Sequence, residues 1–248
     1  MSLPPVQLCV VVPVYNEEEN VQPLADEILQ ALSGQALTFT VVFVDDASRD
    51  KTWVQIEAAC ERDARVQGIR HSQNAGQSAA LWTGMSQTDS RWIATLDGDR
   101  QNDPADLVGM IQRLKEYDFI CGKRVSRQDN WLRRTSSKVA RAARRRVLGV
   151  DFVDTGCALR VFDRAVLAGV FGFNGLHRFL PVIVHGGGFR TLEIPVNHRP
   201  RVAGVSKYGV WNRVWRGMAD LLAIAWYQRR RFPLQEALKS TRPASRRP

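Results

Sequence analysis

Short apolar runs alternate with amphipathic stretches along the first half of the chain. Each apolar run has the length of one buried strand, and the runs lie at 8–12, 39–44, 66–70, 92–96 and 119–122. Stretches that suit helices lie between them, at 17–32, 50–62, 75–86 and 104–116. Pro104 suits the first turn of the last stretch, where its missing N–H costs nothing. This alternation is typical of a mostly parallel sheet with helices on both faces, so we predict an α/β fold.

The alternation weakens beyond residue 122. We predict a basic helix at 131–148, an extended segment at 155–162 and a strand at 189–197. An amphipathic helix rich in tryptophan follows at 211–227. With 248 residues, the chain is long enough for one large α/β domain with a sizeable core.

Acidic residues follow two of the predicted strands. Asp45 and Asp46 end one strand, and Asp97 and Asp99 come directly after another. Side chains two apart in an extended chain point the same way, and the ends of parallel strands meet at one edge of the sheet. Oxygen ligands of this kind suit Mg²⁺ or Mn²⁺, and the amide oxygen of Gln101 is a third candidate ligand. The sequence therefore favours a metal site with a nucleotide beside it.

The alternative for this acidic segment is a solvated turn. Asp103 directly precedes Pro104 and is well placed to cap the following helix, so for Asp103 we favour the cap. For Asp97 and Asp99 we favour the metal, because Asp45 and Asp46 deliver further carboxylates to the same edge. No G-x-G-x-x-G follows the first strand, so the phosphate loop of dinucleotide-binding folds is missing.

Charge is divided unevenly between the two halves of the chain. The net charge is +10, but residues 1–120 hold 9 Lys+Arg against 18 Asp+Glu, whereas residues 121–248 hold 26 against 7. An acidic half suits a cation, and a basic half suits phosphates, nucleic acid or an anionic membrane. A single polyanion-binding surface would not need that division.

The cysteines and the N-terminal residues bear on the compartment. The four cysteines lie far apart without a C-x-x-C pair, which indicates a reducing environment. The N-terminal residues lack the pattern of a secretory signal, and no apolar run approaches the ~18–20 residues that span a bilayer. We therefore expect a cytoplasmic protein, unless a membrane surface holds it.

Six motifs resemble those of a known family. VVPVYNEEENV at 11–21, VDDASRDKT at 44–52, NAGQSAAL at 74–81 and LDGDRQNDPADL at 96–107 resemble the family 2 glycosyltransferases of the GT-A fold. DTGCALRVF at 154–162 and RVAGVSKYG at 201–209 are similar to the dolichol-phosphate-mannose-synthase-like branch, which uses polyprenyl phosphates. The motifs follow the order of the family across residues 8–209. Each is weak alone, and together they are specific.

The resemblance implies particular site residues. The nucleotide site would include Pro13, Tyr15, Glu17, Val44, Asp46 and Asp97. The metal ligands would be Asp97, Asp99 and Gln101, and the candidate catalytic residues are Asp99 and Asp154. The residues that bind the acceptor and its phosphate would be Arg124, Arg133, Ser137, Arg201, Ser206 and Lys207. Arg100 and Asp103 depart from the family pattern, in which an apolar residue and a proline are usual.

The chemistry that the resemblance implies agrees with the uneven charge. A phosphate monoester acceptor, with a second pKa near ~6, is already largely ionised at neutral pH, so no strong general base is required. Cations must instead hold two phosphates together, which arginine does by forked hydrogen bonding. We therefore expect metal-dependent, inverting transfer from a GDP- or UDP-sugar to a polyprenyl phosphate. Residues 1–122 would form the donor and metal half, and residues 123–209 the acceptor half.

Three points stay open at the level of sequence. A hydroxyl acceptor would need Asp154 as a base, although Asp154 could equally orient the acceptor or pair with Arg160. A protein that binds nucleic acid or an anionic surface through 141–146 is the alternative of another class, and we favour the enzyme without nucleic acid. The histidines (His71, His177, His185 and His198) lack zinc-site spacing, so we expect structural or surface roles for them.

The late helix presents an apolar stripe. Its members, at spacings of three and four, are Trp211, Trp215, Met218, Leu222 and Trp226. The stripe either packs on the core or lies in a membrane interface beside its neighbouring arginines, and we favour the interface slightly. We therefore expect an interfacial helix at 210–230, a basic disordered tail at 231–248, and a peripheral position on the cytoplasmic face of an anionic membrane.

Overall fold

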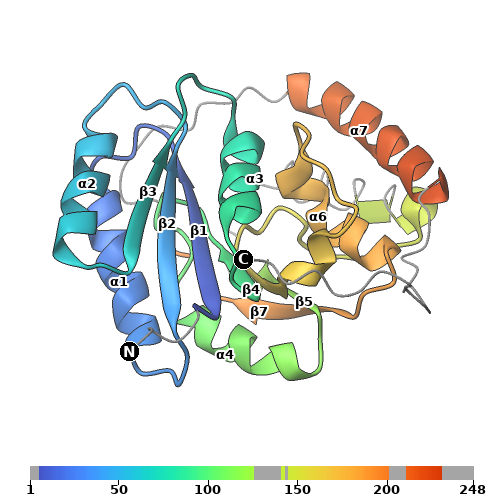
Figure 1. Ribbon diagram of the computed structural model, residues 1–248. Helices are drawn as coiled ribbons and strands as arrows, with labels where there is room; N and C mark the ends of the chain where they lie inside the picture. The colour runs from blue at the N-terminus through green and yellow to red at the C-terminus, as the bar shows by residue number, and fades with distance from the viewer. Residues whose placement is uncertain (1–5, 126–140, 143–144, 201–210, 231–248) are drawn as a thin grey trace, which may run out of the picture.

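The computed structural model describes residues 6–125, 141–142, 145–200 and 211–230, and for 211–219 it describes the helical backbone (Figure 1). The strands are β1 Leu8–Val14, β2 Phe39–Asp45, β3 Val66–Arg70, β4 Trp92–Thr95, β5 Phe119–Arg124, β6 Arg160–Asp163 and β7 Thr191–Val196. The helices are α1 Val21–Ser33, α2 Thr52–Arg62, α3 Gln77–Gln87, α4 Asp106–Gln112, α6 Leu176–Gly186 and α7 Trp211–Arg230. Two short 3₁₀ helices are η1 Arg113–Lys115 and η2 Arg164–Leu167.

The seven strands of the described residues form one sheet in the order β3-β2-β1-β4-β6-β5-β7. Every neighbouring pair is parallel except the two that involve β6, which runs antiparallel between β4 and β5. The carboxyl ends of the other strands and the beginning of β6 therefore share one edge. Loops that leave the strands at this edge can build one site.

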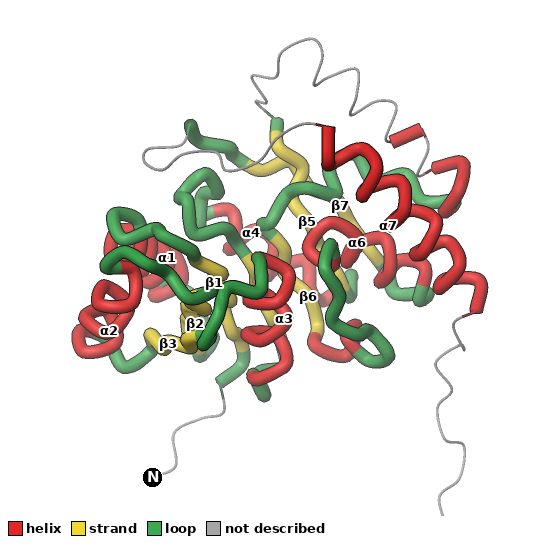
Figure 2. Tube along the Cα trace, turned by 90° about the horizontal axis from the view of Figure 1, so that it is seen from above, coloured by secondary structure: helices red, strands yellow, loops and turns green. Residues whose placement is uncertain are grey.

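Two layers of helices cover the sheet, one on each face. On one face α1, α2 and α4 pack on Leu8, Val10, Val12 and Val14 of β1, and on the other α3 and α6 pack on Cys9 and Val11. Helix α7 lies over α6, farther from the sheet (Figures 1 and 2). Because both faces are buried, the strands read as continuous apolar runs, and the predicted α/β fold is confirmed.

The structure extends and corrects the predicted elements. The five apolar runs of the first half are strands, and the four amphipathic stretches contain helices, the last of which ends at Gln112 and continues as η1. Helix α6 was not predicted, because Pro181 interrupts an apolar stretch within it. Of the extended segment at 155–162, only the part from Arg160 onward is strand. The predicted helix at 131–148 is described at 141–142 and 145–148, where it is helical, and the predicted tail at 231–248 lies outside the described residues.

Candidate active site

Strained backbone gathers at the carboxyl edge of the sheet. Among the residues that the structure describes, three other than glycine have positive φ: Asn16 at 52°, Ala47 at 59° and Arg100 at 58°. They follow β1, β2 and β4, the three adjacent strands whose loops meet there. Left-handed backbone costs an alanine or an arginine about 1 kcal/mol, and such strain tends to cluster at functional sites. The outliers therefore point to this edge as the site.

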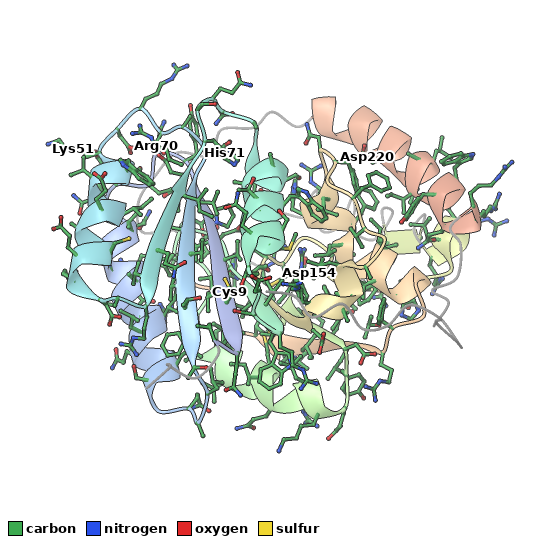
Figure 3. All side chains as sticks on the ribbon, viewed as in Figure 1. Cys9, Lys51, Arg70, His71, Asp154 and Asp220 are labelled. Carbon is green, nitrogen blue, oxygen red and sulfur yellow. The ribbon has the colours of Figure 1, made fainter. Side chains whose placement is uncertain are left out.

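Asp46, the residue directly after β2, fixes the loop that leads into α3. Its Oδ1 accepts the N–H of Ala75 at 2.9 Å, and its Oδ2 accepts the N–H of Gly76 at 2.7 Å. The His71 Nδ1 lies 2.9 Å from the same Oδ1, and Figure 3 shows His71 close to the end of β3. The Asp46 carboxylate is buried and engaged inside the protein. His71 therefore has the structural role expected of it, and contact between Asp46 and a nucleotide stays a prediction.

Pro13, near the end of β1, lies at the same edge, and so do Tyr15 and Glu17 in the loop that follows β1. The Glu17 N–H donates to Thr52 Oγ1 at 2.8 Å, which ties this loop to the start of α2. Val44 is fully buried in the core, so its side chain does not line the edge. The predicted contact between Val44 and a nucleotide could therefore be made only by the Val44 backbone.

The Asp97-Gly98-Asp99 turn stands at the end of β4. Gln77, the first residue of α3, donates from Nε2 to Asp97 Oδ1 at 2.7 Å, and Asp99 Oδ1 accepts the Gln101 N–H at 3.2 Å. A Cβ at Gly98 would lie 2.6 Å from Val14 Cγ1, so only glycine fits against the end of β1 here. Burial, together with the negative charge of Asp99, raises the pKa of Asp97 to about 6.

These residues fit a divalent cation that is shared with a phosphate. The negative charge of Asp99 disfavours ionised Asp97, and a cation beside both carboxylates would relieve that repulsion. Within the described residues no group of three or more His, Cys, Asp or Glu side chains could hold a metal ion. Of the described residues, Asp97, Asp99 and Gln101 would hold the cation, and phosphate oxygens and water would supply further ligands, as Mg²⁺ and Mn²⁺ commonly accept.

The two departures from the family pattern belong to one ion-pair network. Arg100 donates from Nε to Glu27 Oε1 at 3.0 Å, and Arg199 donates from Nη1 to Glu27 Oε2 at 2.6 Å. Arg199 also pairs through Nη2 with Asp103 Oδ1 at 2.8 Å. Asp103 accepts the Ala105 N–H at 3.0 Å in the turn before α4, but the helix begins at Asp106 with Ala105 as its N-cap. The prediction that Asp103 caps this helix was therefore wrong, and its carboxylate instead holds the turn and anchors Arg199.

Arg124 and Asp154 form the basic side of the site. Arg124, the last residue of β5, donates from Nε to Asp154 Oδ2 at 2.6 Å and from Nη2 to Oδ1 at 2.8 Å. The next glycine, Gly156, leaves room for the guanidinium, because a Cβ there would lie 3.3 Å from Arg124 Nη2. The sequence left two roles open for Asp154, and one of them, an ion pair with Arg160, is wrong, because Asp154 pairs with Arg124.

Arg160 is a buried cation on the neighbouring strand. Its side chain is fully buried, and its Nη2 donates to the carbonyl oxygens of Thr155 at 3.1 Å and His177 at 2.5 Å. Among the described residues, no acceptor lies within hydrogen-bond distance of its Nε. Burial lowers the pKa of Arg160, and the negative charges of Asp97 and Asp154 act against that shift. Arg160 thus places positive charge between the Asp97-Gly98-Asp99 turn and the Arg124–Asp154 pair.

Some predicted residues are not described, and some contacts were not foreseen. Arg133, Ser137, Arg201, Ser206 and Lys207 lie outside the described residues, so their roles stay predictions. Sequence reasoning missed Gln77 and Arg199. Gln77 lies within the family-like motif at 74–81, and this was the signal that could have found it.

Helix α7 has a buried face and an exposed face. Leu221, Ile224 and Ala225 are buried beneath it, whereas Leu222 and Trp226 are 60% and 65% exposed. Phe171, which is 54% exposed, packs edge-on against Tyr227 of α7. The part of the predicted stripe that the structure describes therefore faces outward, and the core contact uses other residues. No helix in the described part of the chain is both long and apolar enough to cross a bilayer.

Curated relatives share most of the chain. It is 36% identical over 230 residues to the dodecaprenyl-phosphate galacturonate synthase of Rhizobium johnstonii, an alignment that covers 90% of this chain and 68% of the relative. It is 37% identical over 215 residues to the undecaprenyl-phosphate 4-deoxy-4-formamido-L-arabinose transferase of Shewanella sediminis, covering 86% and 65%. The chain thus spans about two thirds of the length of these relatives.

Solved structures and a family model agree with the fold. The glucosyl-3-phosphoglycerate synthase of Mycobacterium tuberculosis, in complex with Mn²⁺, UDP and phosphoglyceric acid, matches with a TM-score of 0.66 at 15% identity over 90% of this chain and 78% of its own. The mannosyl-3-phosphoglycerate synthase of Rubrobacter xylanophilus matches with a TM-score of 0.65 at 16% identity over 96% and 79%. The predicted GT-A fold is confirmed. The family model described as glycosyl transferase family 2 matches residues 9–171, and the chain belongs to that family.

Proposed function

We propose that this protein transfers a sugar from a nucleotide-sugar donor to the phosphate of a polyprenyl phosphate, with Mg²⁺ or Mn²⁺ bound at the donor. One observation carries the proposal: the acidic Asp97–Asp99 turn and the Arg124–Asp154 pair lie at one edge of one sheet. The relatives that are named for dodecaprenyl phosphate and undecaprenyl phosphate support this class of acceptor.

The donor side stabilises a leaving nucleoside diphosphate. A divalent cation there supplies Lewis-acid stabilisation of the negative charge that develops on the diphosphate. Gln77 holds Asp97 through Oδ1, and the Gln101 N–H holds Asp99. Both carboxylates are thus oriented before the donor arrives, which lowers the cost of assembling the site.

The acceptor side presents a fixed cation. A phosphate monoester is already ionised at neutral pH, so its oxygen needs orientation and charge neutralisation rather than a base. Arg124 is held by both oxygens of Asp154 and is 15% exposed. The alternative, a hydroxyl acceptor, would require Asp154 to take a proton. Because both of its oxygens already accept from Arg124, we favour the phosphate.

The finer assignments extend this proposal. Arg133 and Ser137 would bind the acceptor phosphate beside Arg124, and Arg201, Ser206 and Lys207 would close over the donor phosphates. UDP with Mn²⁺ is the first donor chemistry to test, because the similar mycobacterial structure holds both, and GDP-sugars with Mg²⁺ form the other arm.

We place the reaction at the cytoplasmic surface of an anionic membrane. The exposed side chains of Phe171, Leu222 and Trp226 suit the headgroup level of a lipid interface, and the exposed Arg229 and Arg230 follow them. Peripheral binding of this kind would bring the site to an acceptor that stays in the membrane.

Transfer into lipid is the direct test. The purified protein is incubated with a panel of radiolabelled UDP- and GDP-sugars and undecaprenyl phosphate in detergent, with Mg²⁺ or Mn²⁺, and the products are extracted into organic solvent. We expect label in the organic phase with at least one donor and loss of that label when EDTA is added. Label that reaches only water-soluble glycans would favour the hydroxyl-acceptor alternative.

A further inference from the structure

The loop that carries Asp154 is held by a carboxylate from the edge strand β7. Glu193 accepts the Val153 N–H at 2.8 Å through Oε2 and the Asp154 N–H at 2.9 Å through Oε1. Two successive backbone donors thus bind the two oxygens of one carboxylate. Such charge-assisted pairs are stronger than neutral hydrogen bonds, and their two-point geometry fixes orientation as well as position.

Strand register explains how Glu193 reaches this loop. Cys121 of β5 pairs with Arg160 on β6 and with Glu193 on β7, so the three residues form one row across adjacent strands. Side chains in such a row point to the same face of the sheet. Arg160 donates to the Thr155 carbonyl oxygen, and Glu193 accepts the N–H groups of the two preceding residues, Val153 and Asp154. The backbone around Asp154 is therefore held at three successive residues.

The position of the Asp154 backbone determines the position of Arg124. Asp154 is 8% exposed and uses both carboxylate oxygens to hold Arg124. A rotation of the Asp154 backbone would move both oxygens and with them the guanidinium. We propose that Glu193 is a positioning residue that preorganises Arg124 for the acceptor phosphate through the backbone of Val153 and Asp154. This inference rests on the proposed function, because it takes Arg124 as the ligand of that phosphate.

The test compares two Glu193 variants with a control on the same strands. Glu193→Gln replaces one acceptor oxygen by an NH2 group, which donates and cannot accept, and Glu193→Asp keeps the charge but shortens the side chain, so that neither oxygen reaches the loop. Asp118→Asn is the control, because Asp118 pairs with Arg190 at the opposite end of β5 and β7. The readouts are KM for farnesyl phosphate and for the nucleotide sugar, the Kd of UDP with Mn²⁺, and hydrogen exchange of a peptide that covers 150–158.

We expect both Glu193 variants to raise the acceptor KM by about tenfold, which corresponds to ~1.4 kcal/mol of lost orientation, with donor KM and UDP affinity within about twofold of wild type. Exchange at 150–158 should accelerate in these variants and stay unchanged in Asp118→Asn. An unchanged acceptor KM in folded Glu193 variants, or an equal rise in donor KM, would overturn the inference. If the wild-type protein binds no prenyl phosphate, the proposed function fails, and the exchange data still decide whether Glu193 holds the loop.

Discussion

Arg124 and Asp154 stand 30 residues apart in the chain and meet through two hydrogen bonds of 2.6 and 2.8 Å. Their side chains are 15% and 8% exposed, so water screens the pair only weakly. One partner ends β5, and the other lies in the loop before β6. The pair therefore joins two strands of the sheet at the point where the acceptor is proposed to bind.

Removing one partner should destabilise the fold more than removing both. Asp154→Ala leaves the Arg124 charge buried without its carboxylate, and we expect a loss of roughly 3 kcal/mol in the free energy of unfolding. The double variant Asp154→Ala with Arg124→Met should recover part of that loss. Urea denaturation of both variants measures the difference. As a control, Arg91→Ala removes an exposed partner of Asp163 and should cost less than about 1 kcal/mol.

The Asp97-Gly98-Asp99 turn gives a second prediction. Asp99→Asn removes a charge at the proposed cation site without changing volume, so transfer should be lost while the protein folds normally by circular dichroism. Asp103→Asn weakens the hydrogen bond to the Ala105 N–H and the pair with Arg199, so it should cost about 0.5–1 kcal/mol of stability and keep most of the activity. Radiometric transfer assays and thermal melts separate the two effects. Equal loss of activity in both variants would contradict the division of this segment into ligands and anchor.

The sequence predicted well which acidic residues follow the strands, but it did not predict the residues that hydrogen-bond to them or form ion pairs beside them. Parallel strands deliver their carboxyl ends to one edge, so Asp46, Asp97 and Asp99 could be placed together from local pattern alone. Their partners depend on long-range packing that no local pattern encodes. Gln77 lies 20 residues from Asp97, and Arg199 lies 172 residues from Glu27.

The antiparallel position of strand β6, which was predicted only as part of an extended segment at 155–162, and the whole of helix α6 were missed for related reasons. Strand β6 has only four residues, and its antiparallel position between β4 and β5 follows from its register with both neighbours rather than from its own sequence. Helix α6 contains Pro181 and ends in glycines, so its apolar residues do not read as a helix. Tertiary packing on α3 and on the sheet overrides that weak local preference.

His177 should make stability depend on pH. Its Nδ1 lies 2.6 Å from Ser78 Oγ, its Nε2 accepts from Arg178 Nε at 3.1 Å, and burial with the nearby arginines lowers its pKa to about 3. In the unfolded chain a histidine has a pKa of about 6.5, so it binds a proton at pH values where His177 of the native protein stays neutral. The contribution of His177 to stability is therefore complete above about pH 6.5 and is lost as the pH falls toward about 3. At pH 5 this group should cost about 1–2 kcal/mol relative to pH 7.

A His177→Gln variant isolates this contribution. Asp97 acts in the opposite direction, because its raised pKa lets the native form take up a proton below about pH 6. That effect is common to both proteins and cancels in the comparison. Between pH 7 and pH 5 the variant should therefore lose about 1–2 kcal/mol less stability than wild type, as measured by urea denaturation at each pH. The same change in stability for both proteins would mean that the pKa of His177 is not lowered in the native protein.

Membrane binding should depend on the outward face of α7. Leu222 and Trp226 are exposed while Leu221 and Ile224 are buried, so replacing the exposed pair should spare the core. We expect Leu222→Ser with Trp226→Ser to reduce sedimentation with anionic liposomes by at least about fivefold, because inserting one large apolar side chain contributes on the order of 1 kcal/mol or more. The thermal midpoint and the affinity for UDP with Mn²⁺ should not change.

Salt separates the two components of this binding. The attraction of each basic residue to an anionic surface, about 1 kcal/mol, is screened by salt, whereas insertion of tryptophan is not. High salt should therefore release only part of the wild-type protein from the liposomes and nearly all of the Leu222→Ser, Trp226→Ser variant. Val54→Ser is the matched control, since Val54 is an exposed apolar residue on α2 and should bind liposomes like wild type. If the double variant stays bound at high salt, the apolar contact lies elsewhere on the protein, and the exposed face of α7 is not the membrane surface.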